Sequence, residues 1–325
     1  MKSGTTTLHR LLDGCADVFL PRDEVFYFDL DDAFQHPDFL NDGNAPDFEG
    51  ENERYLARYR ALFADAPEGA CLGEDSTSYL PSRQAAPRIR ALRPDARILA
   101  LLRHPTERTL SHYWHLVRTG RATLGLEETL HQAGFRGGGW DDNAKNRARP
   151  HATLLQRSLY LPQVEHWLRH FPAEQVHFEI FEEFVDDPAA GLQRVRRFLE
   201  LPEATSRQPP RTRFGATRWP RSLGLRLLQN RLLGPHRAPR YDGHLGLEIR
   251  SNDGPLQRVA RGVDRLISRL NDEGNAAPPA VSAGTRRMLD DFFAAETRPL
   301  GKLLGRDLTA LGWPAPAGSV DPATA

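Results

Sequence analysis

The sequence predicts an α/β protein in which helices cover a central, mainly parallel β-sheet. Short apolar segments alternate with longer amphipathic segments along most of the chain, as they do in βαβ units. Residues 97–102 are apolar throughout after Arg97, which is typical of a parallel strand covered on both faces. The chain has 325 residues, of which 39% are hydrophobic, so it can bury a sizeable core. We expect a single domain over residues 1–313 and a disordered tail over residues 314–325.

The expected elements of the N-terminal part follow from hydrophobic spacing. Leucines at helical spacing predict a first helix over residues 5–12, and an apolar run predicts a short strand over residues 24–28. The charged segment 51–64 predicts an amphipathic helix, because its tyrosines and leucines recur on one face. Further apolar runs predict strands over residues 70–74 and 97–102.

The same alternation continues in the second half of the chain. Residues 105–119 predict a helix with proline in its first turn, and residues 156–171 predict another. An apolar run over residues 176–181 predicts a strand, and the acidic pair Asp186-Asp187 predicts the capped start of a helix over residues 188–201. Further helices are expected over residues 222–233, 256–270 and 283–304.

Two segments do not follow this alternation of strands and helices. Residues 135–150 contain Gly137-Gly138-Gly139 and many polar side chains, which predicts a mobile surface loop that serves as a lid or binds an acceptor. Residues 205–255 are rich in Pro, Gly and Arg. We therefore expect the domain to be elaborated between residues 205 and 275, away from the regular alternation.

The charge balance and the cysteine content exclude several classes of protein. The chain carries 43 basic and 43 acidic residues, so it has no general attraction to nucleic acid or to an anionic membrane. Cys15 and Cys71 are too few for a disulfide framework, so a reducing, cytoplasmic setting is expected. No segment reaches the roughly 20 apolar residues of a membrane span. Any binding of phosphate or sulfate must therefore come from a local group of residues.

The first such group opens the chain, directly before the first expected helix. It consists of a lysine and a run of small residues: Lys2, Ser3, Gly4, Thr5, Thr6 and Thr7. A turn of small residues at a helix N-terminus presents backbone N–H groups, hydroxyls add donors, and a lysine adds charge. The run predicts an anion site, although it also fits a Ser- and Thr-rich helix cap. It is not a Walker A sequence, because the order Gly-Lys-Ser/Thr is absent.

The second group follows the apolar strand expected over residues 97–102. Arg103 ends that strand, and Ser111 lies two turns into the next helix. An arginine fork and a hydroxyl can together hold a second phosphate, away from the first. Each residue alone also fits a plainer role, as a partner of a nearby carboxylate or as part of a helix surface.

Together the two groups resemble the sulfotransferases that use 3′-phosphoadenosine 5′-phosphosulfate. In that family a Lys-Ser-Gly-Thr-Thr loop binds the 5′-phosphosulfate, and an Arg…Ser pair binds the 3′-phosphate. Residues 101–113 are similar to the Leu-Arg-x-Pro-x-x-Arg-x-x-Ser-x-Tyr signature of the branch with the heparan sulfate sulfotransferases and many bacterial relatives. Residues 24–29 and 73–80 resemble two other segments of that branch, and residues 305–308 its closing turn. The resemblance implies a three-layer, P-loop-like fold.

The resemblance also implies a role for each matching residue. Lys2 would contact the 5′-phosphate and the bridging oxygen, and the loop would donate hydrogen bonds to the phosphosulfate. Arg103 and Ser111 would hold the 3′-phosphate. No metal is implied. The residues expected to bind the co-substrate are therefore Lys2, Ser3, Gly4, Thr5, Thr6, Thr7, Arg103 and Ser111.

Glu24 falls where this branch has its general base. A carboxylate just before an apolar strand can be desolvated, which tunes it toward accepting a proton. The competing interpretation is a solvated turn residue beside Arg22 and Asp23. His9 and His104 are rival candidates for the base.

Two departures from the family pattern bear on activity. Asp75 stands where the heparan-type enzymes have a lysine near the transferred group, so acceptor handling or rate is expected to differ. The chain also begins at the anion loop, without the strand that usually feeds into it. We therefore expect a start further upstream to give a more soluble protein that binds the nucleotide more tightly.

These observations favour an enzyme that moves a sulfuryl group from 3′-phosphoadenosine 5′-phosphosulfate to a hydroxyl or amine of a small molecule or glycan. Glu24 and Lys2 would be its catalytic residues. One alternative is a P-loop phosphotransferase, and the other is a truncated, non-catalytic nucleotide-binding relative. The pair His166 and His170 lacks the glutamate of a zinc motif, so no metal site is expected. The sequence predicts neither the acceptor nor the oligomeric state.

Overall fold

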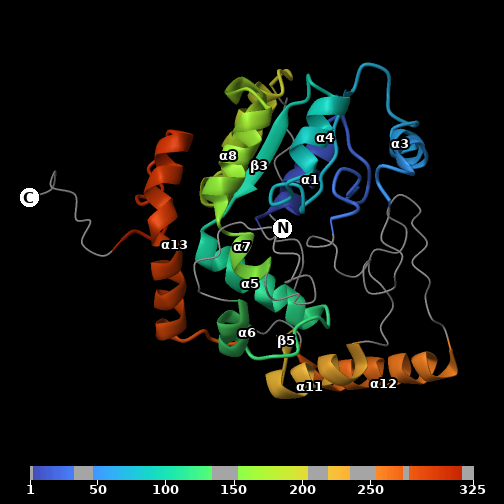
Figure 1. Ribbon diagram of the computed structural model, residues 1–325, viewed down its shortest axis with the longest axis vertical. Coiled ribbons are helices and arrows are strands. Elements are labelled where there is room, and N and C mark those ends of the chain that lie inside the picture. The colour runs from blue at the N-terminus through green and yellow to red at the C-terminus, as the bar shows by residue number, and fades with distance from the viewer. Residues whose placement is uncertain are drawn as a thin grey trace, which may run out of the picture.

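A computed structural model describes residues 3–32, 47–133, 153–203, 219–234, 254–273 and 278–316 (Figure 1). Lys2, the loop expected over residues 135–150 and the tail from residue 317 lie outside the described residues.

Within the described ranges, the strands form three short pairs. Strand β1 (Val18–Phe19) pairs in parallel with β2 (Cys71–Leu72), and β3 (Ile98–Leu102) pairs in parallel with β4 (Val176–Ile180) along its whole length. Strand β5 (Trp219–Pro220) and strand β6 (Asp272–Glu273) form an antiparallel pair. The α/β class and the parallel pairing expected from the sequence are therefore confirmed.

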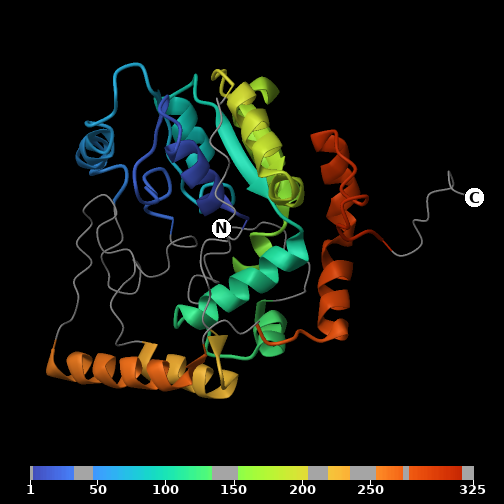
Figure 2. The same ribbon diagram turned by 180° about the vertical axis from the view of Figure 1, so that it is seen from behind.

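Helices make up most of the described chain (Figures 1 and 2). Both views show α13 along one side of the molecule and α11 with α12 at one end, away from β3. The helices are α1 (Thr5–Asp13), α3 (Asn52–Ala61), α4 (Ala85–Leu92), α5 (Pro105–Arg118), α6 (Leu126–Ala133), α7 (Thr153–Gln156), α8 (Tyr160–His170), α9 (Phe181–Asp186), α10 (Pro188–Phe198), α11 (Leu223–Leu233), α12 (Pro255–Asn271) and α13 (Ala283–Leu304).

Helices cover β3 and β4 on both faces. Leu99 and Leu101 of β3 pack with leucines of α1 and α10, because alternate side chains of a strand point to opposite faces. Leu102 packs on the other face against Tyr160 of α8 and Leu300 of α13. The apolar run in β3 is continuous because both faces of the strand are covered by helices.

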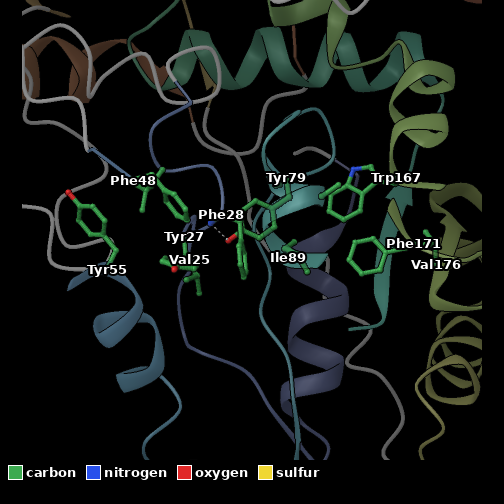
Figure 3. Close-up of a cluster of buried hydrophobic side chains, with 13 residues drawn as sticks. Val25, Tyr27, Phe28, Phe48, Tyr55, Tyr79, Ile89, Trp167, Phe171 and Val176 are labelled. Atoms are coloured by element: carbon green, nitrogen blue, oxygen red, sulfur yellow. Dashed lines mark hydrogen bonds between the residues drawn. The ribbon is translucent and has the colours of Figure 1, made fainter. Parts of the chain in front are cut away.

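A second hydrophobic core is rich in aromatic side chains (Figure 3). Tyr27 stacks on Tyr59 with 4.6 Å between ring centroids, and Phe28 meets Tyr79 edge to face at 5.7 Å. The Trp167 indole N–H donates to the carbonyl of Leu80 over 3.1 Å. This core fixes the segment that carries Glu24 against the segment that follows β2.

The expected strand over residues 24–28 is wrong. The segment has no regular secondary structure, and Phe26 has a positive φ of 55°. Its backbone N–H groups donate to the segment after β2: Val25 to the Asp75 carbonyl over 3.3 Å, and Phe26 to the Ser76 hydroxyl over 2.8 Å. The apolar side chains are buried as expected, but one backbone carbonyl and one side-chain hydroxyl accept these N–H groups in place of a regular partner strand. Apolar spacing alone cannot distinguish these two outcomes.

The expected helix over residues 156–171 is also corrected. It is divided into α7 and α8, and Leu159 between them leaves helical geometry with ψ at 82°. Ser158 in the break is buried and its hydroxyl donates to the carbonyl of Pro105 over 3.2 Å. The buried guanidinium of Arg108 donates to Ser158 and to the carbonyl of Leu154. The break therefore provides acceptors for a buried cation.

Candidate active site

The anion loop expected at the start of the chain is the N-terminus of α1. Gly4 precedes the helix with φ at 84°, and its carbonyl accepts the N–H groups of Thr7 and Leu8 over 2.9 and 3.2 Å. The first N–H groups of a helix lack acceptors within the helix, so they are available to an anion. Ser3 is buried, whereas Thr6 is exposed. The geometry fits the predicted anion site.

Gly4 also allows a close approach. A Cβ atom at this position would lie 2.6 Å from the ring of Phe181, in addition to the strain of a left-handed backbone. We expect Gly4→Ala to lower the free energy of unfolding by about 1 to 2 kcal/mol more than Gly305→Ala, the scale of an overpacked contact. Gly305 is the matched control, because its φ is also positive, at 64°, but its Cβ would meet nothing within 4 Å. Urea unfolding of both variants tests this, and equal losses would contradict it.

Arg103 lies against the same ring. Its guanidinium carbon is 4.8 Å from the centroid of Phe181, a cation–π contact. The Arg103 backbone N–H donates to the Tyr160 hydroxyl over 3.4 Å, and the Ser3 hydroxyl also hydrogen bonds to Tyr160. Two aromatic side chains thus connect the end of β3 with the anion loop. Ser111 is half-buried on α5, and its link to a phosphate stays a prediction.

Glu24 has the environment of a tuned base. Burial raises the pKa of its carboxyl, and the nearby charge of Asp75 raises it further, whereas the Thr77 hydrogen bond and Arg157 lower it. The Thr77 hydroxyl donates to Glu24 Oε2 over 3.1 Å. Glu24 is partly buried and hydrogen bonded to Thr77, which favours the base over the competing interpretation of a solvated turn residue.

The two rival histidines occupy different places. His9 Nδ1 lies 2.9 Å from Asp75 Oδ1, so α1 contacts the segment that carries the Glu24 partner Thr77. His104 Nε2 lies 3.0 Å from the carbonyl of Gly312, in the turn that follows α13. His9 therefore belongs to the acid–base group around Glu24, and the ring of His104 contacts the C-terminal turn.

Glu74 belongs to the same group and was missed by the sequence argument. It is deeply buried, and burial raises its pKa to about 8, while the hydroxyls of Tyr79 and Ser76 donate to it over 3.0 and 3.1 Å. Its signals in the sequence are its position two residues after the short strand β2 and its place in the family-like segment 73–80. Three acidic side chains thus meet near α1: Glu24, Glu74 and Asp75.

Two negative findings apply to the described part of the chain. No set of three or more His, Cys, Asp or Glu side chains there is grouped so that it could hold a metal ion. Within the same ranges, every helix is too short or too polar to cross a bilayer.

Comparisons with known proteins address the family of the chain. A family model described as "Sulfotransferase family" matches residues 1–205. Human heparan sulfate glucosamine 3-O-sulfotransferase 6 is 35% identical over 167 residues, which cover 51% of this chain and 46% of that protein. Human heparan sulfate glucosamine 3-O-sulfotransferase 3B1 is 32% identical over 171 residues, which cover 51% and 40%. The matched part is thus less than half of the length of either relative.

A solved structure extends the likeness to nearly the whole chain. The crystal structure of a sulfotransferase from Alicyclobacillus acidocaldarius is 26% identical, with a TM-score of 0.60, and the alignment covers 95% of this chain and 94% of that one. The family model alone matches more than half of the 325 residues. Because the matched region also contains the anion loop, Arg103 and Glu24, we conclude that the chain belongs to the sulfotransferase family.

Proposed function

We propose that this sulfotransferase uses 3′-phosphoadenosine 5′-phosphosulfate and transfers its sulfuryl group to a hydroxyl of a glycan. The observation that carries the proposal is that the anion loop and Arg103 both contact the same two aromatic side chains, Phe181 and Tyr160. A donor with phosphate groups at two ends of a nucleoside needs two such separate anion contacts.

The chain's own residues fit that donor. The N-terminus of α1 and the loop before it would bind the phosphosulfate, and the absence of a side chain at Gly4 lets Phe181 pack against this loop. Arg103 would bind the 3′-phosphate through its fork, with Ser111 as a second donor. Lys2 would neutralise the charge of the departing phosphate, and Thr5, Thr6 and Thr7 would donate hydrogen bonds at the first turn of α1.

Glu24 would accept the proton of the acceptor hydroxyl as the acceptor oxygen attacks the sulfur. A buried carboxylate with a raised pKa is a better base near neutral pH than a solvated one. The Thr77 hydroxyl would orient the carboxylate. In-line transfer then requires only positioning and charge stabilisation, so the bond to the departing phosphate breaks as the bond to the acceptor forms.

A glycan acceptor is favoured over an unrelated small molecule by the relatives, whose names assign them to heparan sulfate glucosamine. An amine acceptor is the second option, because the same base could deprotonate it. The two are distinguished by the position of the new sulfate in the product.

Calorimetry with 3′,5′-bisphosphoadenosine and with ATP tests the nucleotide assignment. We expect the first ligand to bind without magnesium and the second to bind much more weakly. Tighter binding of ATP, dependent on magnesium, would instead favour a P-loop phosphotransferase.

A further inference from the structure

We propose that His9 takes part in the transfer as an imidazolium held by Asp75, with its second N–H stabilising the negative charge of the transferring sulfuryl group. The inference rests on the function proposed above. In this step the sulfur–oxygen bond to the departing phosphate breaks and the bond to the acceptor oxygen forms. The proton of the acceptor moves to Glu24, and His9 keeps its proton throughout.

The geometry of the pair is the first argument. His9 lies on α1, one turn beyond Thr5, and its Nδ1 is 2.9 Å from Asp75 Oδ1. Both side chains are mostly enclosed, with 14% of His9 and 26% of Asp75 exposed. A partly buried ion pair of this kind is screened less by salt than one on the surface. The histidine is therefore fixed within the turn of helix that follows the anion loop.

The charges around His9 are the second argument. Asp75 faces it from the segment after β2, Glu24 faces it from the segment before α3, and Asp13 lies on α1 itself. All three are acidic. The hydrogen bond to Asp75 raises the pKa of His9 most, burial lowers it, and the charges of the three carboxylates raise it further. Such a histidine is a poor base and a good electrostatic donor.

Access to a ligand is the third argument. His9, Thr5, Asp75 and Thr77 line a cavity of about 900 Å³ that is also bordered by β2 and β3. Nδ1 of His9 is bound to Asp75, whereas Nε2 has no partner in the ranges that the structure describes. An imidazolium needs acceptors for two N–H groups, so one donor is available to an anion beside the loop.

A protonated His9 also reduces the repulsion between the carboxylates of the site and the anionic donor. Asp75 and Glu24 place two carboxylates near a site that must accept a strongly anionic donor. Like charges at short range repel, and the repulsion grows where water is excluded. A protonated His9 offsets the charge of Asp75, and Glu24 remains available to act as the base.

Two substitutions of His9 and one control separate charge from shape. We expect His9→Gln to lower kcat about tenfold, the scale of one charge-assisted hydrogen bond, because glutamine can still donate to Asp75 but carries no charge. His9→Lys keeps a cation beside Asp75 and should retain activity within a few-fold of the unmodified protein. The matched control is His131→Gln on α6, an exposed histidine that should leave turnover unchanged. Thermal unfolding of each variant checks that it is folded.

The pH dependence of kcat distinguishes a role of the His9 charge in the transfer from a purely structural role of His9. An active imidazolium is present below its pKa, so kcat should fall as the pH rises through the pKa of His9. Asp75→Asn removes the partner that raises this pKa, and the fall should move to lower pH. In His9→Lys the fall should move toward the higher pH range in which lysine titrates.

The inference is overturned if folded His9→Gln keeps the turnover and the basic limb of the unmodified protein, or if Asp75→Asn leaves that limb in place. Equal losses in His9→Gln and His9→Lys would also overturn it, because the cation would then be irrelevant. Failure of the proposed function looks different: the unmodified protein itself would transfer no sulfuryl group to any glycan offered.

Discussion

Glu24→Gln is expected to lower kcat by about 10²- to 10⁴-fold while nucleotide affinity barely changes. Glutamine keeps the size of the side chain and can still accept the hydrogen bond from Thr77, but it cannot take a proton from the acceptor. In the unmodified protein, kcat should fall as the pH drops through the raised pKa of Glu24, since only the ionised carboxylate is a base. That acid limb should disappear in the variant, as measured by initial rates across the pH range.

Glu296→Gln is the matched control for this change. Glu296 lies on α13, and burial raises its pKa to about 7, while its carboxylate accepts the Leu161 N–H over 3.4 Å. It therefore undergoes the same chemical change in a similar environment, without contact with the anion loop. Turnover of Glu24→Gln within a few-fold of the unmodified protein would contradict the assignment and move the base role to another residue.

Arg103→Ala is expected to weaken binding of 3′,5′-bisphosphoadenosine by roughly 1.5 to 3 kcal/mol, as one charge-assisted contact is lost. The guanidinium stands over Phe181, which also contacts Gly4, so the substitution removes charge at the border of the loop. Calorimetry of the folded variant measures the loss directly.

The analogue that lacks the 3′-phosphate serves as the control ligand for Arg103→Ala. Its affinity should be nearly unaffected, because Arg103 is assigned to the 3′-phosphate alone. Equal losses for both ligands would contradict that assignment, and they would give Arg103 the structural role of holding Phe181 and Tyr160 in place.

The elements best predicted from the sequence are those whose signals are local. Strand β3 and helix α5 lie within one residue of expectation, because a continuous apolar run and a first-turn proline mark their starts. Helix α13 has the expected bounds, and the hydroxyl of its N-cap Ser282 accepts the Thr285 N–H of the first turn. Helix α4 was not anticipated, since it has only 8 residues, contains Pro87, and depends for its burial on the aromatic core.

In the candidate site, too, features with a local sequence signal could be predicted, whereas contacts between distant residues could not. The anion loop and Arg103 could be recognised because each is a short run beside a predictable helix or strand. The pairing of His9 with Asp75 could not, because 66 positions separate them and only the packed fold brings them together. The same holds for Thr77 with Glu24, 53 positions apart. Side-chain partners at such distances are determined by tertiary packing, which periodicity does not report.

The most direct test of sulfuryl transfer follows both products of one reaction. The protein is incubated with 3′-phosphoadenosine 5′-phosphosulfate carrying a labelled sulfur and with an unsulfated glucosamine-containing glycan. We predict that labelled glycan and 3′,5′-bisphosphoadenosine form in equal amounts, and that Glu24→Gln forms neither at a comparable rate. Tight binding of the nucleotide without label in any glycan, amine or simple hydroxyl acceptor would contradict the proposed catalytic activity.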